Sequence, residues 1–210
     1  SILKINTEES FDNISIISIF EMLRRKDNTL KLGVLSGAIV ILPTELNAQL
    51  TKILTINKND YSSKAIEGTT YCEFTFKGGN KNKVKFVSEL FEKGYINVLI
   101  GTKSLLGEGW DSPCINSLIL ASFVGSFVLS NQMRGRAIRI YKGEPDKCSN
   151  IWHLVTLEPN MDEIQEDKVK SNDYAVLERR FKSFVGPNYS TGEIESGIER
   201  ISNIKMYIYS

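Results

Sequence analysis

The sequence predicts an α/β protein in which parallel strands are joined by crossover helices. Segments with strand patterns and helix patterns alternate along the chain at the spacing that crossover connections require. The apolar strand segments lack alternating polar residues, as expected for a sheet that helices cover on both faces. After about Glu158 the chain becomes polar and acidic and then helical in pattern. We therefore expect an α/β domain over residues 1–157 and a helical C-terminal extension over residues 158–210.

Apolar spacing and turn residues define the expected elements of the first part of the chain. Apolar residues recur at helical spacing in "FDNISIISIFEMLRRK", whereas "LKLGVLSGAIVILP" is a β-rich run that Ser36-Gly37 interrupts and Pro43 ends. The expected elements are a helix over residues 11–26, strands within 30–43, a helix over 44–54, a loop over 57–69, a strand over 70–76 and a turn over 77–83.

The second part of the chain repeats the alternation of strands and helices. The strand "YINVLIGT" runs directly into a glycine-rich loop, and "SNQMRGRAIRIY" follows another apolar strand after a short linker. The expected elements are a helix over residues 84–94, strands over 95–102 and 115–123, a helix over 130–141, a strand over 150–157, and helices over 174–185 and 192–201.

Composition and charge are those of an ordinary globular protein. The 210 residues are 41% hydrophobic and carry a net charge of +1, so bulk charge decides neither for nor against nucleic acid. The 3 cysteines form no CxxC pair, which predicts no zinc site and no disulfide framework and favours a reducing, cytoplasmic setting. The longest apolar runs fall short of the roughly 20 residues that span a bilayer, so we expect no membrane association.

Two segments carry the residues that indicate chemistry, and each follows a predicted strand. Ligands of parallel α/β sheets bind at the carboxyl ends of the strands, where both segments are expected to open. In "GTKSLLGEGWDSP" the glycines Gly101, Gly107 and Gly109 let the backbone approach a ligand closely. Asp111 can accept hydrogen bonds from sugar hydroxyls or pair with an arginine. Taken alone, this loop also fits a tight turn with helix caps.

The second segment, "SNQMRGRAIR", concentrates arginines on a predicted helix. Gln132, Arg136 and Arg139 are spaced i, i+4 and i+7 and would share one helical face. The guanidinium group is always charged and binds phosphate oxygens in a fork, so this face resembles a polyphosphate clamp. A solvated basic helix face is the alternative interpretation.

The residues around these arginines favour a site at the rim of a core. Ile138 and Ile140 indicate that the opposite face of the helix is buried. Gly135 in mid-helix costs about 1 kcal/mol relative to alanine, which indicates that another backbone approaches there.

These two segments resemble known motifs. "VLIGTKSLLGEGWDSP" is similar to motif V, and "QMRGRAIR" matches the QxxGRxxR pattern of motif VI, of the superfamily 2 helicases and translocases. The resemblance covers residues 85–157 best. It implies a parallel-sheet, RecA-like helicase C-terminal domain that shares an ATP site with an N-terminal RecA-like domain. The chain has no GxxxxGK[ST] sequence, so it would be one half of a motor and inactive by itself.

The resemblance also implies a role for each matching residue. Arg136 and Arg139 would be arginine fingers on the γ-phosphate, and Gln132 would couple that phosphate to domain closure. Gly109 and Asp111 would approach the nucleotide sugar or brace the fingers.

A second group of residues would contact the track along which the motor moves. Thr102, flanked by Gly101 and Lys103, would bind the nucleic-acid backbone, with DNA favoured over RNA. ATP is the expected cofactor, and Mg²⁺ would be held mainly by the absent N-terminal domain. Trp110, which we expect to be a core residue, and the long tail favour a bacterial relative of restriction-type or repair motors.

Two other functions remain open on the sequence. One is a RecA-like module without hydrolytic activity, in which the arginines hold a phosphorylated ligand or RNA. The other is a nucleotide-sugar transferase, which also combines parallel sheets with basic phosphate clamps. A Walker A sequence and an acidic Mg²⁺ motif encoded upstream of Ser1 would distinguish the motor from the transferase.

Overall fold

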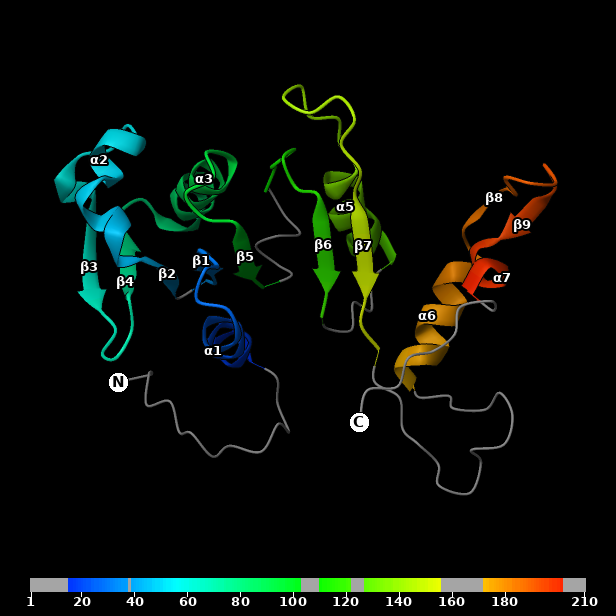
Figure 1. Cartoon of the computed structure of the whole chain (residues 1–210), viewed down its shortest axis with the longest axis horizontal. Coiled ribbons are helices and arrows are strands. Elements are labelled where there is room, and N and C mark those ends of the chain that lie inside the picture. The colour runs from blue at the N-terminus through cyan, green and yellow to red at the C-terminus, as the bar shows by residue number, and fades with distance from the viewer. Residues whose placement is uncertain (1–14, 38, 103–109, 122–126, 156–171, 202–210) are drawn as a thin grey trace, which may run out of the picture. The chain divides into compact units, whose positions relative to one another are not determined.

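The computed structural model describes residues 15–37, 39–102, 110–121, 127–155 and 172–201, and it divides the chain into two compact units. The first unit contains residues 1–115 and 135–147, and the second contains residues 116–134 and 148–210. The first unit is formed by α1 (Ile16–Lys26), β1 (Leu32–Leu35), β2 (Val40–Pro43), η1 (Thr44–Ala48), α2 (Leu50–Ile53), η2 (Lys58–Asp60), β3 (Tyr61–Ala65), β4 (Tyr71–Phe76), α3 (Gly79–Glu92) and β5 (Val98–Gly101) (Figure 1).

The first unit is built on a five-stranded mixed sheet with the order β3-β4-β2-β1-β5. Only β1 and β5 run parallel, whereas β1 and β2, β2 and β4, and β3 and β4 are antiparallel. The chain reverses between β1 and β2 in a tight turn, where the Ser36 N–H donates to Ile39 O at 2.8 Å. The prediction of an α/β fold is confirmed, and the prediction that its sheet is parallel is wrong for this unit.

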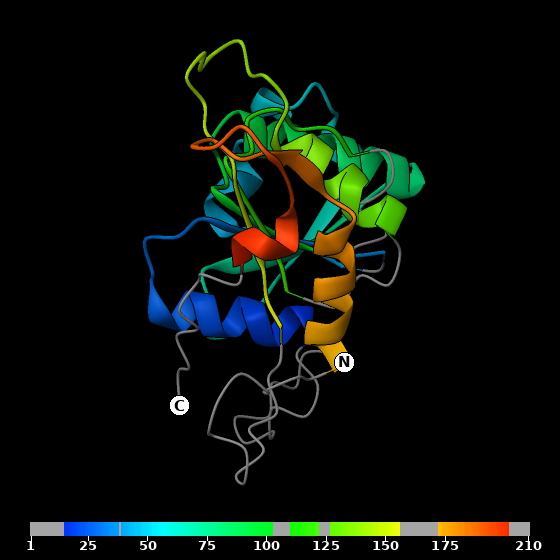
Figure 2. The ribbon, with the colours of Figure 1, turned by 90° about the vertical axis from the view of Figure 1, so that its right-hand side faces the viewer.

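Helices cover both faces of this sheet, with α1 on one face and α2 and α3 on the other (Figures 1 and 2). All residues of β1 and β2 are buried, as the absence of polar alternation predicts. The core on the side of α1 contains Phe20, Leu32, Val34, Ile41, Ile66, Tyr71 and Ile100. The larger core on the side of α2 and α3 includes Leu35, Leu42, Leu50, Phe74, Val87 and Leu90.

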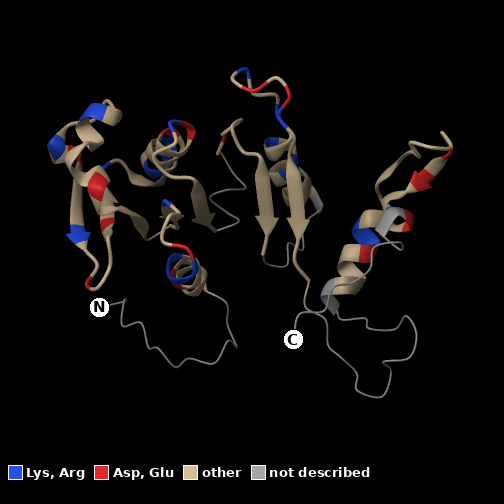
Figure 3. Ribbon diagram, in the orientation of Figure 1, with Lys and Arg blue, Asp and Glu red and all other residues tan. Residues whose placement is uncertain are grey.

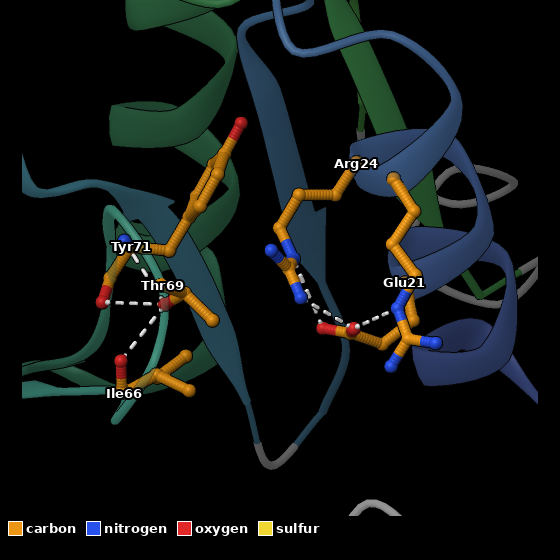
Figure 4. Close-up of polar contacts among 6 residues, drawn as sticks. Glu21, Arg24, Ile66, Thr69 and Tyr71 are labelled. Atoms are coloured by element: carbon orange, nitrogen blue, oxygen red, sulfur yellow. Dashed lines mark hydrogen bonds and ion pairs between the residues drawn. The ribbon is translucent and has the colours of Figure 1, made fainter. Parts of the chain in front are cut away.

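Polar contacts fix the edges of the core on the side of α1. The helix is capped by Ser15, whose hydroxyl accepts from the Ser18 N–H at 3.0 Å. Glu21 is buried on α1, and its carboxylate accepts from Arg24 Nη2 at 2.7 Å, which compensates the burial of its charge (Figure 4). Thr69 shapes the turn before β4 by donating to Ile66 O at 2.9 Å.

The second unit is formed by β6 (Ser117–Leu120), most of α5 (Phe127–Ala137), β7 (Asn150–His153), α6 (Asn172–Lys182), β8 (Val185–Pro187), β9 (Ile194–Ser196) and α7 (Gly197–Ile201). Strands β6 and β7 are parallel, with Ile119 opposite Trp152. Arg134 of α5 packs on Phe184, which follows α6, with its guanidinium carbon 4.1 Å from the centre of the phenyl ring. Strands β8 and β9 form an antiparallel hairpin, so the C-terminal extension is not purely helical as predicted.

The structure differs from three predicted elements, in one strand that was not predicted and in the bounds of two helices. The expected loop over residues 57–69 contains β3, an exposed edge strand without apolar alternation. The expected turn over residues 77–83 contains the first turns of α3, which begins at Gly79. Helix α5 ends at Ala137 rather than continuing to residue 141. No helix in the described part of the chain is both long and apolar enough to cross a membrane.

Candidate functional site

The structure describes most of the residues that the sequence singles out. Gly101 is the last residue of β5, and Thr102 follows it, with its N–H donating to Leu35 O at 3.3 Å. Thr102 therefore continues the parallel pairing of β5 with β1 at the carboxyl ends of both strands. The predictions for Lys103, Gly107 and Gly109 concern residues outside the described part of the chain.

The segment from Trp110 to Ile115 is anchored in the first unit by its buried residues. Trp110 is almost fully buried, and its ring centre lies 6.5 Å from that of Phe91 on α3, so the prediction that Trp110 is a core residue is confirmed. Ser112 is fully buried, and its hydroxyl lies 3.3 Å from Cys114 Sγ. Asp111 lies between these two buried anchors and is itself exposed.

Asp111 and Arg139 form an ion pair, which joins the two segments that the sequence analysis selected. Both side chains are about half exposed, so the pair is accessible to a ligand and adds at most about 1 kcal/mol to stability. Of the two partners that the sequence allows for Asp111, the structure has the arginine.

Arg136 lies beside this pair, in the last turn of α5. Partial burial lowers the pKa of Arg136, and the positive charge of Arg139 lowers it further, while Asp111 acts in the opposite direction. Two guanidinium groups therefore share the surroundings of one carboxylate in the first unit. Guanidinium groups bind anions such as phosphate through charge-assisted hydrogen bonds.

The helical stripe predicted for the arginines is shorter than expected. Arg139 lies beyond the end of α5, with its N–H 3.4 Å from Arg136 O, so it does not share a helical face with Gln132 and Arg136. Gln132 is exposed on α5, one turn before Arg136.

The prediction for the two isoleucines of this segment is wrong, and the prediction for Gly135 finds no support among the described residues. Ile138 and Ile140 are 64% and 87% exposed, because α5 ends before them and they extend past its packed face. Among the residues that the structure describes, a Cβ built on Gly135 would meet no atom within 4 Å outside its own helix and chain neighbours.

Lys147 is a site residue that the sequence analysis does not predict. Its ammonium group donates hydrogen bonds to Pro113 O, Ala137 O and Arg139 O. A lysine near the end of a predicted helix is a general signal for contact with the last helical carbonyls, but nothing in the sequence indicates the contact with Pro113.

Charge is distributed unevenly around this site. The loop between α5 and β7 carries Arg139, Lys142, Glu144, Asp146 and Lys147, so it presents both signs of charge, whereas α5 itself carries only arginines among its charged residues (Figure 3). The positive charges of the candidate site therefore come from Arg136 on α5 and from Arg139 and Lys147 in the loop after it.

Comparison of the chain with protein-family models, with curated proteins and with solved structures finds no match.

Proposed function

We propose that this chain is the second motor domain of an ATP-dependent nucleic-acid helicase or translocase. The observation that supports this most directly is the ion pair between Asp111 and Arg139, with Arg136 beside it. The pair brings together the segments that resemble motifs V and VI, although those segments lie far apart in the sequence. In this proposal the ATP site is completed by an N-terminal RecA-like domain outside the chain.

Arg136 and Arg139 would act on the γ-phosphate of ATP. Guanidinium groups donate charge-assisted hydrogen bonds to phosphate oxygens and stabilise the negative charge of the phosphoryl-transfer transition state. Before nucleotide binds, Asp111 holds Arg139 in place, and on binding the phosphate would compete with this carboxylate. Gly109 would approach the nucleotide sugar, and Gln132 would couple binding of the γ-phosphate to closure of the two domains.

Asp111, Arg136 and Arg139 do not form a suitable binding site for Mg²⁺. Asp111 is paired with Arg139, and the described residues contain no group of three or more metal-binding side chains. The proposal therefore assigns Mg²⁺ to the N-terminal domain, where it would neutralise charge on the phosphates. This chain's own contribution is the positive charge of its arginines.

The proposed contact with nucleic acid lies at the end of β5. Gly101, Thr102 and Lys103 would contact a nucleic-acid backbone, since backbone N–H, hydroxyl and ammonium groups all bind phosphate oxygens, and DNA is the track that we propose. A RecA-like fold is supported only by the parallel pairs β1–β5 and β6–β7. On the resemblance of its motifs and the pattern of its cysteines, we propose that the protein is a cytoplasmic motor of the bacterial restriction or repair type.

The test is the ATPase activity of the full-length product with single-stranded DNA, double-stranded DNA and RNA in turn. We expect hydrolysis that nucleic acid stimulates, and DNA to stimulate it more than RNA. The 210-residue chain alone is expected to hydrolyse ATP negligibly because it lacks a P-loop sequence. Robust turnover by the isolated chain, or no turnover by the full-length product, would contradict the proposal.

A further inference from the structure

Lys147 connects three backbone carbonyls of the candidate site. Its Nζ lies 2.6 Å from Pro113 O, 2.8 Å from Ala137 O and 2.8 Å from Arg139 O. An ammonium group has three N–H donors, so these contacts use the full donor capacity of the side chain. The group is therefore held at one point, where the three carbonyls converge.

The three carbonyls belong to the two segments that the ion pair joins. Pro113 lies two residues after Asp111, whereas Ala137 is the last residue of α5 and Arg139 follows it. Carbonyls at the carboxyl end of a helix lack partners within the helix and carry partial negative charge, so they attract a cation. Lys147 thus ties the backbone next to Asp111 to the backbone that carries Arg139.

Consecutive turns in the loop after α5 place Lys147 beside the end of that helix. Tyr141 pairs with Glu144 in an isolated bridge, and the Lys147 N–H donates to Glu144 O at 3.1 Å. Gly143 lies against the Tyr141 ring, where an added Cβ would come within 2.9 Å of the ring carbon Cε1. These consecutive turns bring the chain back to the end of α5.

The ion pair alone would hold Arg139 weakly, because both of its side chains are half exposed and solvent competes for them. Three charge-assisted hydrogen bonds to backbone atoms are a firmer constraint. We infer that Lys147 is a positioning residue, which sets the distance between Asp111 and Arg139 and thereby aims Arg139. This inference rests on the proposed function of Arg139 as an arginine finger.

The inference predicts a specific kinetic signature. The hydrogen bonds that Lys147 donates to described residues all end on backbone carbonyls of this chain, so its loss should leave ATP binding intact and misplace Arg139 in the transition state. Displacement of a catalytic group by about 1 Å costs about 10²-fold in rate. We therefore expect Lys147 to affect kcat and to leave KM unchanged.

The experiment measures the ATPase activity of the full-length product with Lys147→Met, which keeps much of the side-chain length and removes the charge and donors. We expect kcat to fall about 10- to 100-fold, with KM for ATP and nucleic-acid affinity changed by less than about twofold. Lys142→Met is the matched control, since Lys142 is an exposed lysine of the same loop, and it should leave kcat unchanged. Assays run well below the unfolding midpoint of each variant keep the folded fraction equal.

Two further variants separate positioning from general stabilisation. Lys147→Arg keeps the charge, but its planar fork cannot place donors on three converging carbonyls, so a folded Lys147→Arg protein should still lose about 10-fold in kcat. In an Arg139→Lys background, Lys147→Met should lower kcat by less than about twofold, because the group that it positions is already absent. A purely structural lysine would give the same loss in both backgrounds.

The outcomes distinguish this inference from the proposed function. If Arg139→Ala abolishes turnover while folded Lys147→Met and Lys147→Arg proteins stay within about twofold of wild type, Lys147 does not position Arg139 and the proposed function stands. If Arg136→Ala and Arg139→Ala both leave turnover unchanged, the arginine-finger assignment fails and the inference about Lys147 fails with it.

Discussion

The five-stranded sheet of the first unit and the β6–β7 sheet of the second unit contain similar short apolar strands but differ in how much of each strand is buried. In the first unit every residue of β1 and β2 is buried, because helices lie on both faces. In the second unit Ile119 on β6 and Trp152 on β7 are opposite each other and 60% and 58% exposed. The apolar sequence of a short strand therefore does not by itself determine burial. The helices and strands packed around the strand determine which of its two faces is buried.

The difference in burial predicts a difference in stability between matched substitutions. Leu42→Ala removes a fully buried side chain from the larger core and should cost about 2–5 kcal/mol of unfolding free energy. Ile119→Ala removes an exposed side chain and should cost about 0.5 kcal/mol or less. Urea denaturation followed by circular dichroism measures both, and equal losses would show that the exposed face of β6 is covered in solution.

Two glycines of the first unit offer a second comparison, between a packed and an open backbone position. A Cβ on Gly33 in β1 would lie 2.7 Å from Ile96 Cδ1 in a closely packed core, so Gly33→Ala should destabilise the chain by about 1–3 kcal/mol. A Cβ on Gly135 in α5 would meet no described atom within 4 Å outside its own helix, so Gly135→Ala should stabilise the chain by up to about 1 kcal/mol. Opposite signs in thermal unfolding support the difference in packing, and destabilisation by Gly135→Ala would contradict it.

The second unit contains the histidine of the chain, and its imidazole lies within the packing of that unit. His153 on β7 lies against Phe181 of α6, and its pKa is lowered first by burial and then by the positive charges of Arg134 and Arg180. In the unfolded chain the imidazole has its ordinary pKa of about 6.5. Below that pH the unfolded state binds a proton that the folded state resists, so the free energy of unfolding falls as the pH falls.

We therefore expect the second unit to lose stability between about pH 7 and pH 5. Because the chain has 1 histidine, its imidazole resonance can be followed directly by NMR, and its midpoint should lie below the ordinary value. His153→Gln is the control and should remove the pH dependence in this window. A midpoint at or above the ordinary value would contradict this account of the second unit.

The sequence predicted those elements whose apolar pattern is strong. Buried strands such as β1, β2 and β4 and the amphipathic helix α6 were found because burial determines their residue types. Strand β3 was missed because its residues are largely exposed and polar. The antiparallel direction of β2 follows from the tight turn at Ser36, and hydrophobic pattern alone does not define strand direction.

Part of the candidate site could also be predicted. Motif spacing selected Asp111, Arg136 and Arg139, and the structure brings these three together in the first unit. The end of α5 at Ala137 was not predicted, because "RAIRIY" continues the helical pattern past the last helical residue. Lys147 was missed because its three carbonyl partners converge only in the folded chain.

The central claim is that Arg136 and Arg139 act on a triphosphate held by a neighbouring domain. The most direct measurement is the turnover of ATP by the full-length product at saturating ATP and nucleic acid, for wild type, Arg136→Ala and Arg139→Ala. We predict that each substitution lowers kcat by about 10³- to 10⁵-fold while nucleotide affinity changes by less than about tenfold. Turnover by both variants at the wild-type rate would contradict the claim.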